Sequence, residues 1–261
     1  MAGKYTFTNK VLFSTDSLNG YGLDLVFSVA KEAGCDGIDL ALWKNFDARH
    51  DSYVKKLTEQ YKLPVEVVQT SAKVNAKELN QAITICQQTG AKHISINAPS
   101  YFDVKTFTFL TNNLSTYQKQ YPDITFSIIN PDTASMSYLP FPKYRFRNVG
   151  EIIKKYKCKI GFDISAMDEE TIETVMTTKM SELASHISVC YVSDRKKEKY
   201  HILPGEWTYN IPSILKNMAK NKYTGYFSVK LQFDPQTLVN NEKVLFQIEK
   251  SLQYINEHFH S

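Results

Sequence analysis

The chain has 261 residues, of which 43% are apolar, 22% charged and 13% aromatic, which is enough apolar material for one large core. This composition excludes a disordered, collagen-like or low-complexity scaffold. The 31 Lys and Arg residues nearly balance the 27 Asp and Glu residues, and these charges are interspersed along the chain, which argues against a nucleic-acid-binding face. We therefore expect one domain over residues 1–261 and a small-molecule partner.

Cysteine spacing and hydropathy favour a cytoplasmic protein. The four cysteines, Cys35, Cys86, Cys158 and Cys190, form no Cys-x-x-Cys motif, so neither a zinc knuckle nor a disulfide framework is predicted. Residues 1–10 are polar, and no run approaches the roughly 18 to 20 apolar residues that a membrane span needs. We expect a reducing compartment and no membrane partner.

Short β-rich runs alternate along the chain with longer segments of helical period, as in parallel strands joined by crossover helices. The predicted strands are Val11–Ser14, Gly37–Leu42, Val65–Gln69, His93–Asn97, Thr125–Ile129, Ile160–Asp163, His186–Ser193 and Tyr226–Leu231. The predicted helices are Leu23–Ala33, Ala48–Tyr61, Ala76–Thr89, Val104–Tyr121, Arg147–Tyr156, Glu169–Ala184, Ile211–Asn221 and Thr237–His258. Two long connections remain: a proline-rich loop over Asn130–Arg145 and a charged loop after the seventh strand.

Eight such units at about 33 residues each match the roughly 250-residue norm of a single (β/α)8 TIM barrel, an α/β fold. A doubly wound open sheet is the alternative. It would carry a glycine-rich fingerprint after the first strand, but Ser14 to Ser17 read Ser-Thr-Asp-Ser there, and the chain has no G-x-G-x-x-G or Walker A motif. The barrel is therefore the predicted fold.

In such a barrel the functional groups lie at the carboxyl ends of the strands. The residues predicted there are Thr15, Asp16, Asp39, Trp43, Gln69, Asn97, Asn130, Asp163, Tyr191, Ser193, Asp194 and Lys230. The loop after the seventh strand adds Arg195, Lys196, Lys197, Lys199, Tyr200, His201 and Glu206. Polar groups of both signs thus converge on one concave region. Among the histidines, His201 is the candidate for titration near neutrality, whereas His50 fits a solvated helix cap better than a base.

Seven short phrases occur in a characteristic order: GCDGIDL, GAKHISINAP, FSIIN, GFDIS, VCYVSDR, LPGEW and GYFSVKL. Through their order and spacing, nearly the whole chain resembles the xylose isomerase-like TIM-barrel superfamily of sugar-phosphate isomerases and epimerases. This resemblance implies a divalent metal, such as Mn²⁺ or Mg²⁺, held by Glu, Asp, His and Glu at the ends of strands five to eight. The two glutamates would also serve as acid and base.

The chain departs from that pattern at most of the ligand positions. Strand five ends at Asn130, the seventh-strand His position reads Tyr191, and the eighth-strand Glu position reads Lys230, so only Asp163 remains. Because a lysine ammonium repels a dication, we predict that the usual metal site is absent and that Lys230 takes its electrostatic role opposite Asp163. The catalytic candidates are accordingly Lys230, Asp163, Glu206 and Tyr191.

Strand alternation places Tyr226, Ser228 and Lys230 on the face of the last strand that turns toward the barrel interior. Lys230 could act as a proton-transfer base or form a Schiff base, but a carboxylate partner would keep it protonated, which favours binding over covalent chemistry. A surface position at the strand end is the competing interpretation. Asp163 fits either a functional carboxylate or a buried partner that orients Lys230.

The predicted substrate-binding residues lie at other strand ends and in the loops near them. They are Asn130, Asp194, Arg195, His201, Trp207, Asn97 and Trp43. Trp207 replaces the glycine of the superfamily phrase Pro-Gly-Glu-Gly, so it could stack on a sugar or merely pack its loop. The basic run from Arg195 to Lys199 would suit a phosphate or carboxylate, although such runs are often solvated. Trp43, Tyr101, Phe102, Tyr138 and Phe141 could line a pocket or anchor loops.

Two functions remain open at this point. The first is a sugar or sugar-phosphate isomerase or epimerase with a degenerate, metal-free site, in which Glu206, His201 or Tyr191 would have to supply the missing base. The second is a non-catalytic barrel that binds a sugar-like or anionic metabolite or a protein partner. A metal-dependent abasic-site endonuclease is discarded, because the required His and Glu ligands and DNA-inserting basic loops are absent from the sequence. A homodimer stays open.

Overall fold

The computed structural model of the protein describes residues 9–131, 145–146, 149–167, 180–197, 199–207 and 210–259. In these residues eight parallel strands close into a barrel with the order β1-β10-β7-β6-β5-β4-β3-β2. The barrel strands are β1 (Val11–Ser14), β2 (Gly37–Ala41), β3 (Val65–Thr70), β4 (His93–Asn97), β5 (Thr125–Ile129), β6 (Lys159–Asp163), β7 (Ile187–Val192) and β10 (Tyr226–Val229). The predicted TIM barrel is therefore confirmed, and the open sheet is excluded.

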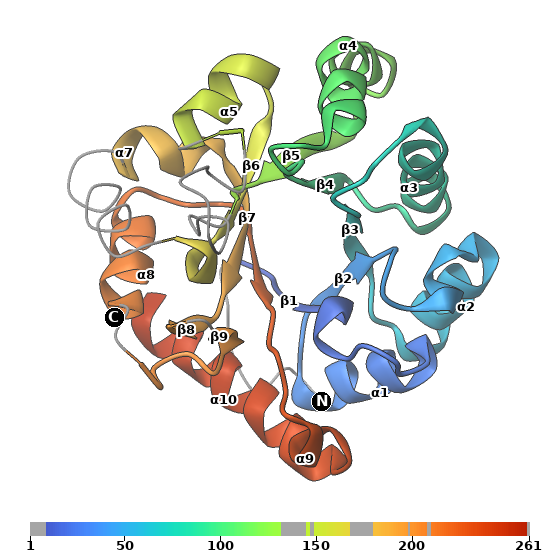
Figure 1. Ribbon diagram of the computed structural model, residues 1–261. Coiled ribbons are helices and arrows are strands. Elements are labelled where there is room, and N and C mark those ends of the chain that lie inside the picture. The colour runs from blue at the N-terminus through green and yellow to red at the C-terminus, as the bar shows by residue number, and fades with distance from the viewer. Residues whose placement is uncertain are drawn as a thin grey trace.

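Helices surround the barrel, as Figure 1 shows looking along it. They are α1 (Leu23–Ala33), α2 (Asp51–Tyr61), α3 (Ala76–Thr89), α4 (Val104–Gln120), α5 (Val149–Tyr156), α7 (Met180–Leu183), α8 (Ile211–Lys220), α9 (Pro235–Leu238) and α10 (Asn241–Phe259). Gly34 and Gly90 end α1 and α3 in the left-handed conformation, which glycine adopts without steric cost. None of the helices in the described residues is both long and apolar enough to span a membrane.

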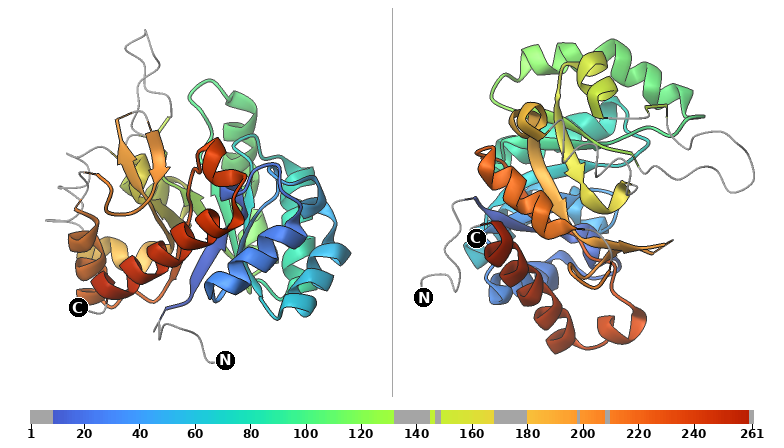
Figure 2. Two further views of the ribbon diagram at one scale, coloured as in Figure 1. Left: turned by 90° about the horizontal axis from the view of Figure 1, so that it is seen from below. Right: turned by 90° about the vertical axis from the view of Figure 1, so that its left-hand side faces the viewer.

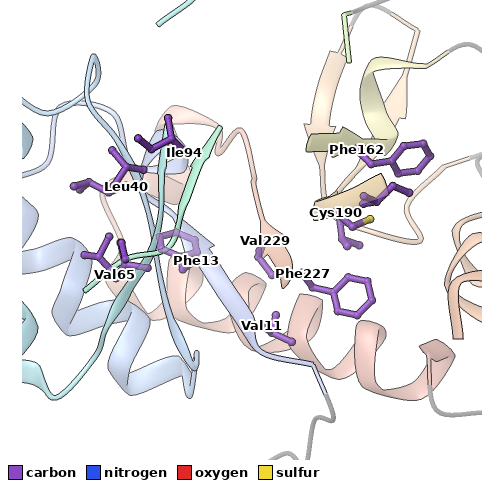
Figure 3. Close-up of a cluster of buried hydrophobic side chains, with 14 of the residues drawn as sticks. Val11, Phe13, Leu40, Val65, Ile94, Phe162, Cys190, Phe227 and Val229 are labelled. Atoms are coloured by element: carbon purple, nitrogen blue, oxygen red, sulfur yellow. The ribbon is translucent and has the colours of Figure 1, made fainter. Parts of the chain in front are cut away.

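Alternating strand residues build two separate layers. The outward-facing set, including Phe13, Leu40 and Phe227, packs under the helices and forms the main apolar core (Figure 3). The inward-facing set holds a smaller apolar cluster of Leu12, Val67, Ile129, Val189 and Tyr191. Serine, carboxyl and amide side chains fill the rest of the barrel interior, so the side chains above this cluster are mostly polar.

Most element bounds agree with the predictions to within two residues, and three segments need correction. The helix predicted over Ala48–Tyr61 is a 3-10 turn (Phe46–Arg49) followed by α2, and the Asp47 carboxylate in that turn accepts the backbone N–H of Leu23. The closing helix is divided into α9 and α10, with Asp234 capping α9 through the amides of Gln236 and Thr237. Of the helix predicted over Glu169–Ala184, residues 169–179 lie outside the described part.

The third correction concerns the charged loop after the seventh strand, which contains an antiparallel hairpin. Strand β8 (Asp194–Lys196) pairs with β9 (Lys199–Ile202), and Figure 2 shows this hairpin standing beyond the carboxyl ends of the barrel strands. Both oxygens of the buried Asp194 carboxylate accept backbone N–H groups, from Arg195 at 2.8 Å and from Trp207 at 3.0 Å. One side chain thus fixes the start of the hairpin and the loop that follows it.

Candidate functional site

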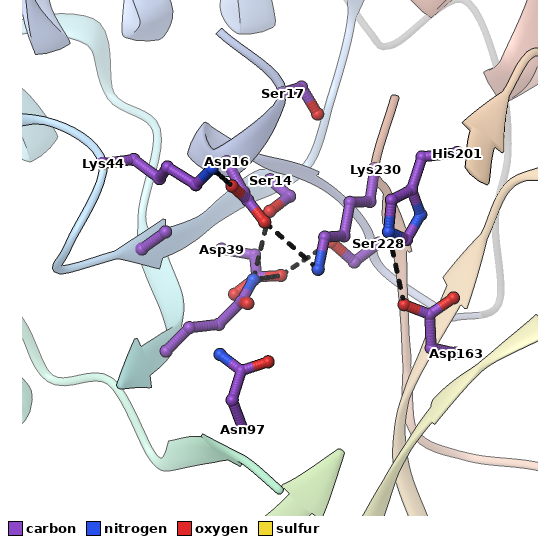
Figure 4. Close-up of polar contacts among 12 residues, drawn as sticks. Ser14, Asp16, Ser17, Asp39, Lys44, Asn97, Asp163, His201, Ser228 and Lys230 are labelled. Carbon is purple, nitrogen blue, oxygen red and sulfur yellow. Dashed lines mark hydrogen bonds and ion pairs between the residues drawn. The ribbon is translucent and has the colours of Figure 1, made fainter. Parts of the chain in front are cut away.

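The barrel mouth, meaning the carboxyl ends of the eight strands, collects charged side chains from several elements (Figure 4). Lys230 follows β10 directly, and its side chain turns into the mouth with only 9% of its surface exposed. Its Nζ lies 3.2 Å from Asp16 Oδ2 and 5.4 Å from the centre of the Tyr191 ring. The surface position considered for Lys230 is therefore wrong.

The carboxylate partner of Lys230 is Asp16, which corrects the predicted direct pair with Asp163. Asp16 belongs to the 3-10 turn Thr15–Ser17 after β1, and its Oδ1 is 3.1 Å from Lys44 Nζ in the loop after β2. Burial would raise the pKa of Asp16, but Lys230 and Lys44 hold that pKa below its usual value. Burial would likewise lower the pKa of Lys230, yet Asp16 and Asp163 raise it, so the ammonium stays protonated. A Schiff-base role is thereby disfavoured.

Asp163 is paired instead with His201, which the β9 strand carries into the mouth. His201 Nε2 lies 3.7 Å from Asp163 Oδ2, while its Nδ1 is 2.9 Å from Ser165 Oγ and 3.0 Å from Ser193 Oγ. The Ser165 hydroxyl also donates to Asp163 Oδ1 at 2.8 Å. Burial lowers the pKa of His201, and the neighbouring Asp163 only partly offsets this effect, so the imidazole is neutral at pH 7.

Asn130 has a backbone-binding role at the end of β5. Its carboxamide donates to the Asp163 carbonyl at 3.1 Å and accepts the Asp163 N–H at 2.6 Å. This two-point pairing extends the contact between β5 and β6 beyond the last ladder hydrogen bond and fixes the backbone that carries Asp163. Asn97 acts similarly on a neighbouring strand, because its amide donates to the Thr70 carbonyl at 2.7 Å.

A second polar cluster lies deeper in the barrel, on the side of Lys230 away from His201 (Figure 4). Asp39 of β2 is fully buried, and its Oδ2 accepts hydrogen bonds from Gln69 Nε2 at 2.6 Å and Ser228 Oγ at 2.8 Å. Its Oδ1 has no hydrogen-bond partner among the described residues. Burial raises the pKa of Asp39 to about 7 in spite of these hydrogen bonds, so this carboxyl titrates near neutrality.

The other predicted site residues differ in how deeply they are buried. Tyr191 is fully buried beneath Lys230, and burial raises its phenol pKa well above the usual value, so it stays neutral. Glu206 is exposed in the loop after β9, and Trp43 is half-buried beside Lys44. Trp207 is 43% exposed with Lys196 Nζ 4.1 Å from its ring centre. Their binding and catalytic roles stay predictions.

Arg195 and Asp194 serve the hairpin itself. The Arg195 guanidinium lies 4.2 Å from the Tyr200 ring centre and donates to the carbonyls of Lys197 and Met167. Asp194 is committed to backbone amides, as described above. These contacts place both side chains in the scaffold that holds His201. Of the predicted pocket aromatics, Tyr138 and Phe141 lie outside the described residues, and Phe102 is 61% exposed in the loop before α4.

The described side chains do not fit a divalent metal. A metal held by Asp163 and His201 would need further anionic or neutral donors, but Asn130 is committed to the Asp163 backbone and Lys230 brings a positive charge. Within residues 9–131 and the later described segments, no three His, Cys, Asp or Glu side chains form a group that could hold a metal ion. That the protein works without a metal remains a prediction.

Comparison with known proteins supports the fold. No family model matches the sequence, and no curated protein sequence matches it. Among solved structures, a xylose isomerase domain containing protein from Salmonella typhimurium LT2 aligns with a TM-score of 0.72 and 14% identity, over 97% of this chain and 99% of that one. An L-ribulose 3-epimerase aligns with a TM-score of 0.70 and 11% identity, over 97% and 95% of the two chains.

A third similar structure is that of the IolI protein with a zinc atom, which aligns with a TM-score of 0.69 and 14% identity over 97% of this chain and all of that one. Other similar structures include a D-tagatose 3-epimerase-like protein and a sugar phosphate isomerase/epimerase. The structural resemblance to xylose isomerase-like TIM barrels is therefore confirmed. At identities of 11 to 15% it establishes the fold, and the chemistry of the mouth must be argued from its own residues.

Proposed function

We propose that the barrel mouth binds a sugar or sugar phosphate and isomerises or epimerises it without a divalent metal. One observation carries this proposal: a buried, protonated Lys230 ammonium lies between Asp16 on one side and the His201–Asp163 pair on the other. The ammonium can stabilise negative charge that develops on a substrate carbonyl oxygen, as a metal would. His201 can accept a proton from the neighbouring carbon.

The arrangement around His201 suits a base. Its Nε2 is 3.7 Å from Asp163, beyond hydrogen-bond distance, so this nitrogen is not committed to the carboxylate. The Ser165 and Ser193 hydroxyls orient the ring through Nδ1, and Asp163 would stabilise the imidazolium that forms. Returning the proton to the adjacent carbon, while a hydroxyl proton passes to the former carbonyl oxygen, completes an isomerisation with one base.

A non-catalytic binding protein is the second candidate, and a specific observation favours it. The strand ends offer an amide at Asn130 and an ammonium at Lys230 in place of the two glutamates that the resemblance implies. With both ring nitrogens of His201 facing protein groups, the same mouth could hold a ligand without moving a proton. Cytoplasmic location and a homodimer belong to the proposal as expectations.

Solvent exchange separates the two candidates. A panel of aldoses, ketoses and their phosphates is incubated with the protein in D2O and EDTA, and deuterium incorporation beside the carbonyl is followed by proton NMR. We expect incorporation for one class of sugar, slowed about 10²- to 10⁴-fold by His201→Gln. The matched control is His50→Gln, since His50 is exposed at the start of α2. Binding by calorimetry without any exchange would establish the non-catalytic candidate instead.

A further inference from the structure

Lys44, Asp16 and Lys230 form a compact group of two ammoniums on one carboxylate. The two cations contact different oxygens of Asp16, Lys44 at Oδ1 (3.1 Å) and Lys230 at Oδ2 (3.2 Å). Among the described residues Asp16 is the one carboxylate in ion-pair contact with either ammonium, while Asp163 and Asp39 act on Lys230 from beyond ion-pair distance. An anion that reaches these ammoniums would add charge-assisted hydrogen bonds to the group.

The group is held rigidly by the turn that carries Asp16. On one side of Asp16, the Thr15 hydroxyl accepts the N–H of Ala41, at the end of β2, at 2.9 Å. On the other side, the Ser17 hydroxyl accepts the N–H of Leu231, next to Lys230, at 2.9 Å. Asp16 is thus fixed between the two strands that lead to the lysines, with one carboxylate oxygen toward each ammonium.

Exposure increases from the inner lysine to the outer one. The side chains of Lys230, Asp16 and Lys44 are 9%, 13% and 30% exposed, so the group opens toward solvent at Lys44. Apart from Asp16, the Lys230 ammonium faces only the Tyr191 ring among its close contacts in the described residues, and Lys44 has Asp16 alone as its ion-pair partner there. Each ammonium keeps N–H groups for a further acceptor.

We propose that Lys44 binds the anionic group of the ligand, a carboxylate or phosphate, while Lys230 remains available for the carbonyl oxygen, with Asp16 as the residue that positions both ammoniums. This inference rests on the proposed function for the identity of the ligand, because it places the charged group of a sugar acid or sugar phosphate. The charged loop after β7, where the sequence suggested anion binding, uses Arg195 and Lys196 for contacts with Tyr200 and Trp207 instead.

Calorimetric titration with inorganic phosphate and with gluconate, at low ionic strength in EDTA, tests the site without requiring turnover. Lys44→Met should weaken binding about ten- to hundredfold, since it removes one charged hydrogen-bond donor. Lys119→Met is the control, because Lys119 is exposed in the last turn of α4 at the opposite end of the barrel, and it should bind like wild type. Tighter binding of phosphate or of gluconate identifies which anion the site prefers.

A second variant keeps the test decisive. Asp16→Asn leaves both ammoniums without their carboxylate, so its thermal midpoint should fall, and phosphate should raise that midpoint more than it raises the midpoint of wild type. Equal phosphate affinity in wild type and Lys44→Met, or no added stabilisation of Asp16→Asn, would overturn the inference. Anion binding without deuterium exchange would retain this site and reject the catalytic proposal, whereas exchange of neutral sugars without anion binding would do the reverse.

Discussion

Asp39 is the buried residue whose charge state matters most for the interior of the barrel. Its carboxyl accepts hydrogen bonds from Gln69, which also donates to Ser14, and from Ser228, and one of its oxygens has no partner among the described residues. Lys230 favours the ionised form and Asp16 opposes it, but burial is the largest influence and raises the pKa to about 7. Below this pKa Asp39 is neutral, so the barrel interior does not hold an unpaired anion beneath the mouth.

This environment predicts a pH-dependent stability difference between wild type and Asp39→Asn. Because the pKa of Asp39 rises from 3.8 unfolded to about 7 folded, the folded state holds the extra proton between these values, and wild type loses stability as pH rises through them. The loss approaches about 4 kcal/mol at pH 8, and Asp39→Asn escapes it. Urea unfolding of both proteins from pH 4.5 to pH 8 measures the difference, with the exposed Asp123→Asn as control. A constant difference across this range would contradict the assignment.

At the scale of elements, the β8–β9 hairpin has the largest consequence for the site. It brings His201 to Asp163, so a residue outside the barrel strands supplies the imidazole that strand seven lacks. His201 has a positive φ of 56°, an uncommon conformation for a residue with a side chain, and its carbonyl accepts the Gln232 N–H at 2.7 Å. Contacts with the segment after β10 and with Asp194 therefore determine where the imidazole lies.

We expect Asp194→Ala to disturb the site through this hairpin. Removing the carboxylate leaves the N–H groups of Arg195 and Trp207 without their acceptor, which should lower the free energy of unfolding by about 2 to 4 kcal/mol. It should also shift the NMR signals of the His201 ring. Asp234→Ala is the matched control: it removes the cap of α9 in the loop after β10, lowers the free energy of unfolding less than Asp194→Ala, and leaves those signals in place. Unchanged His201 signals in Asp194→Ala would show that the hairpin does not depend on this residue.

Across the whole molecule, periodicity and turn residues were sufficient to predict the barrel. Val11–Ser14, Ala76–Thr89 and Thr125–Ile129 have the predicted bounds because apolar spacing and glycine stops are local signals. The inward direction of Lys230 also followed from strand alternation. Its partner did not, because Asp16 follows β1 and Asp163 ends β6 beside the same interior, and only the three-dimensional path of the turn at Thr15–Ser17 selects Asp16.

Two other parts of the site depend on contacts between distant segments. Lys44 lies in a loop with no motif, although its place three residues after β2 was a usable signal. The hairpin was hidden because β8 reads Asp-Arg-Lys, residues that are not typical of strands, and because Asp194 stabilises the hairpin by binding the backbone of Trp207. Local sequence patterns show neither which distant residue Lys44 contacts nor which distant backbone Asp194 binds.

The central claim is that a lysine ammonium, rather than a divalent ion, supplies the positive charge of this site. Thermal unfolding of the purified protein in EDTA, and then with saturating Mn²⁺, Mg²⁺, Co²⁺ or Zn²⁺, tests it most directly. A ligand at about 100 times its dissociation constant adds roughly 2.7 kcal/mol, equivalent to about 5 to 10 °C for a chain of this size. The account predicts the same midpoint with and without each metal. A shift of this order that Asp163→Asn abolishes would contradict it.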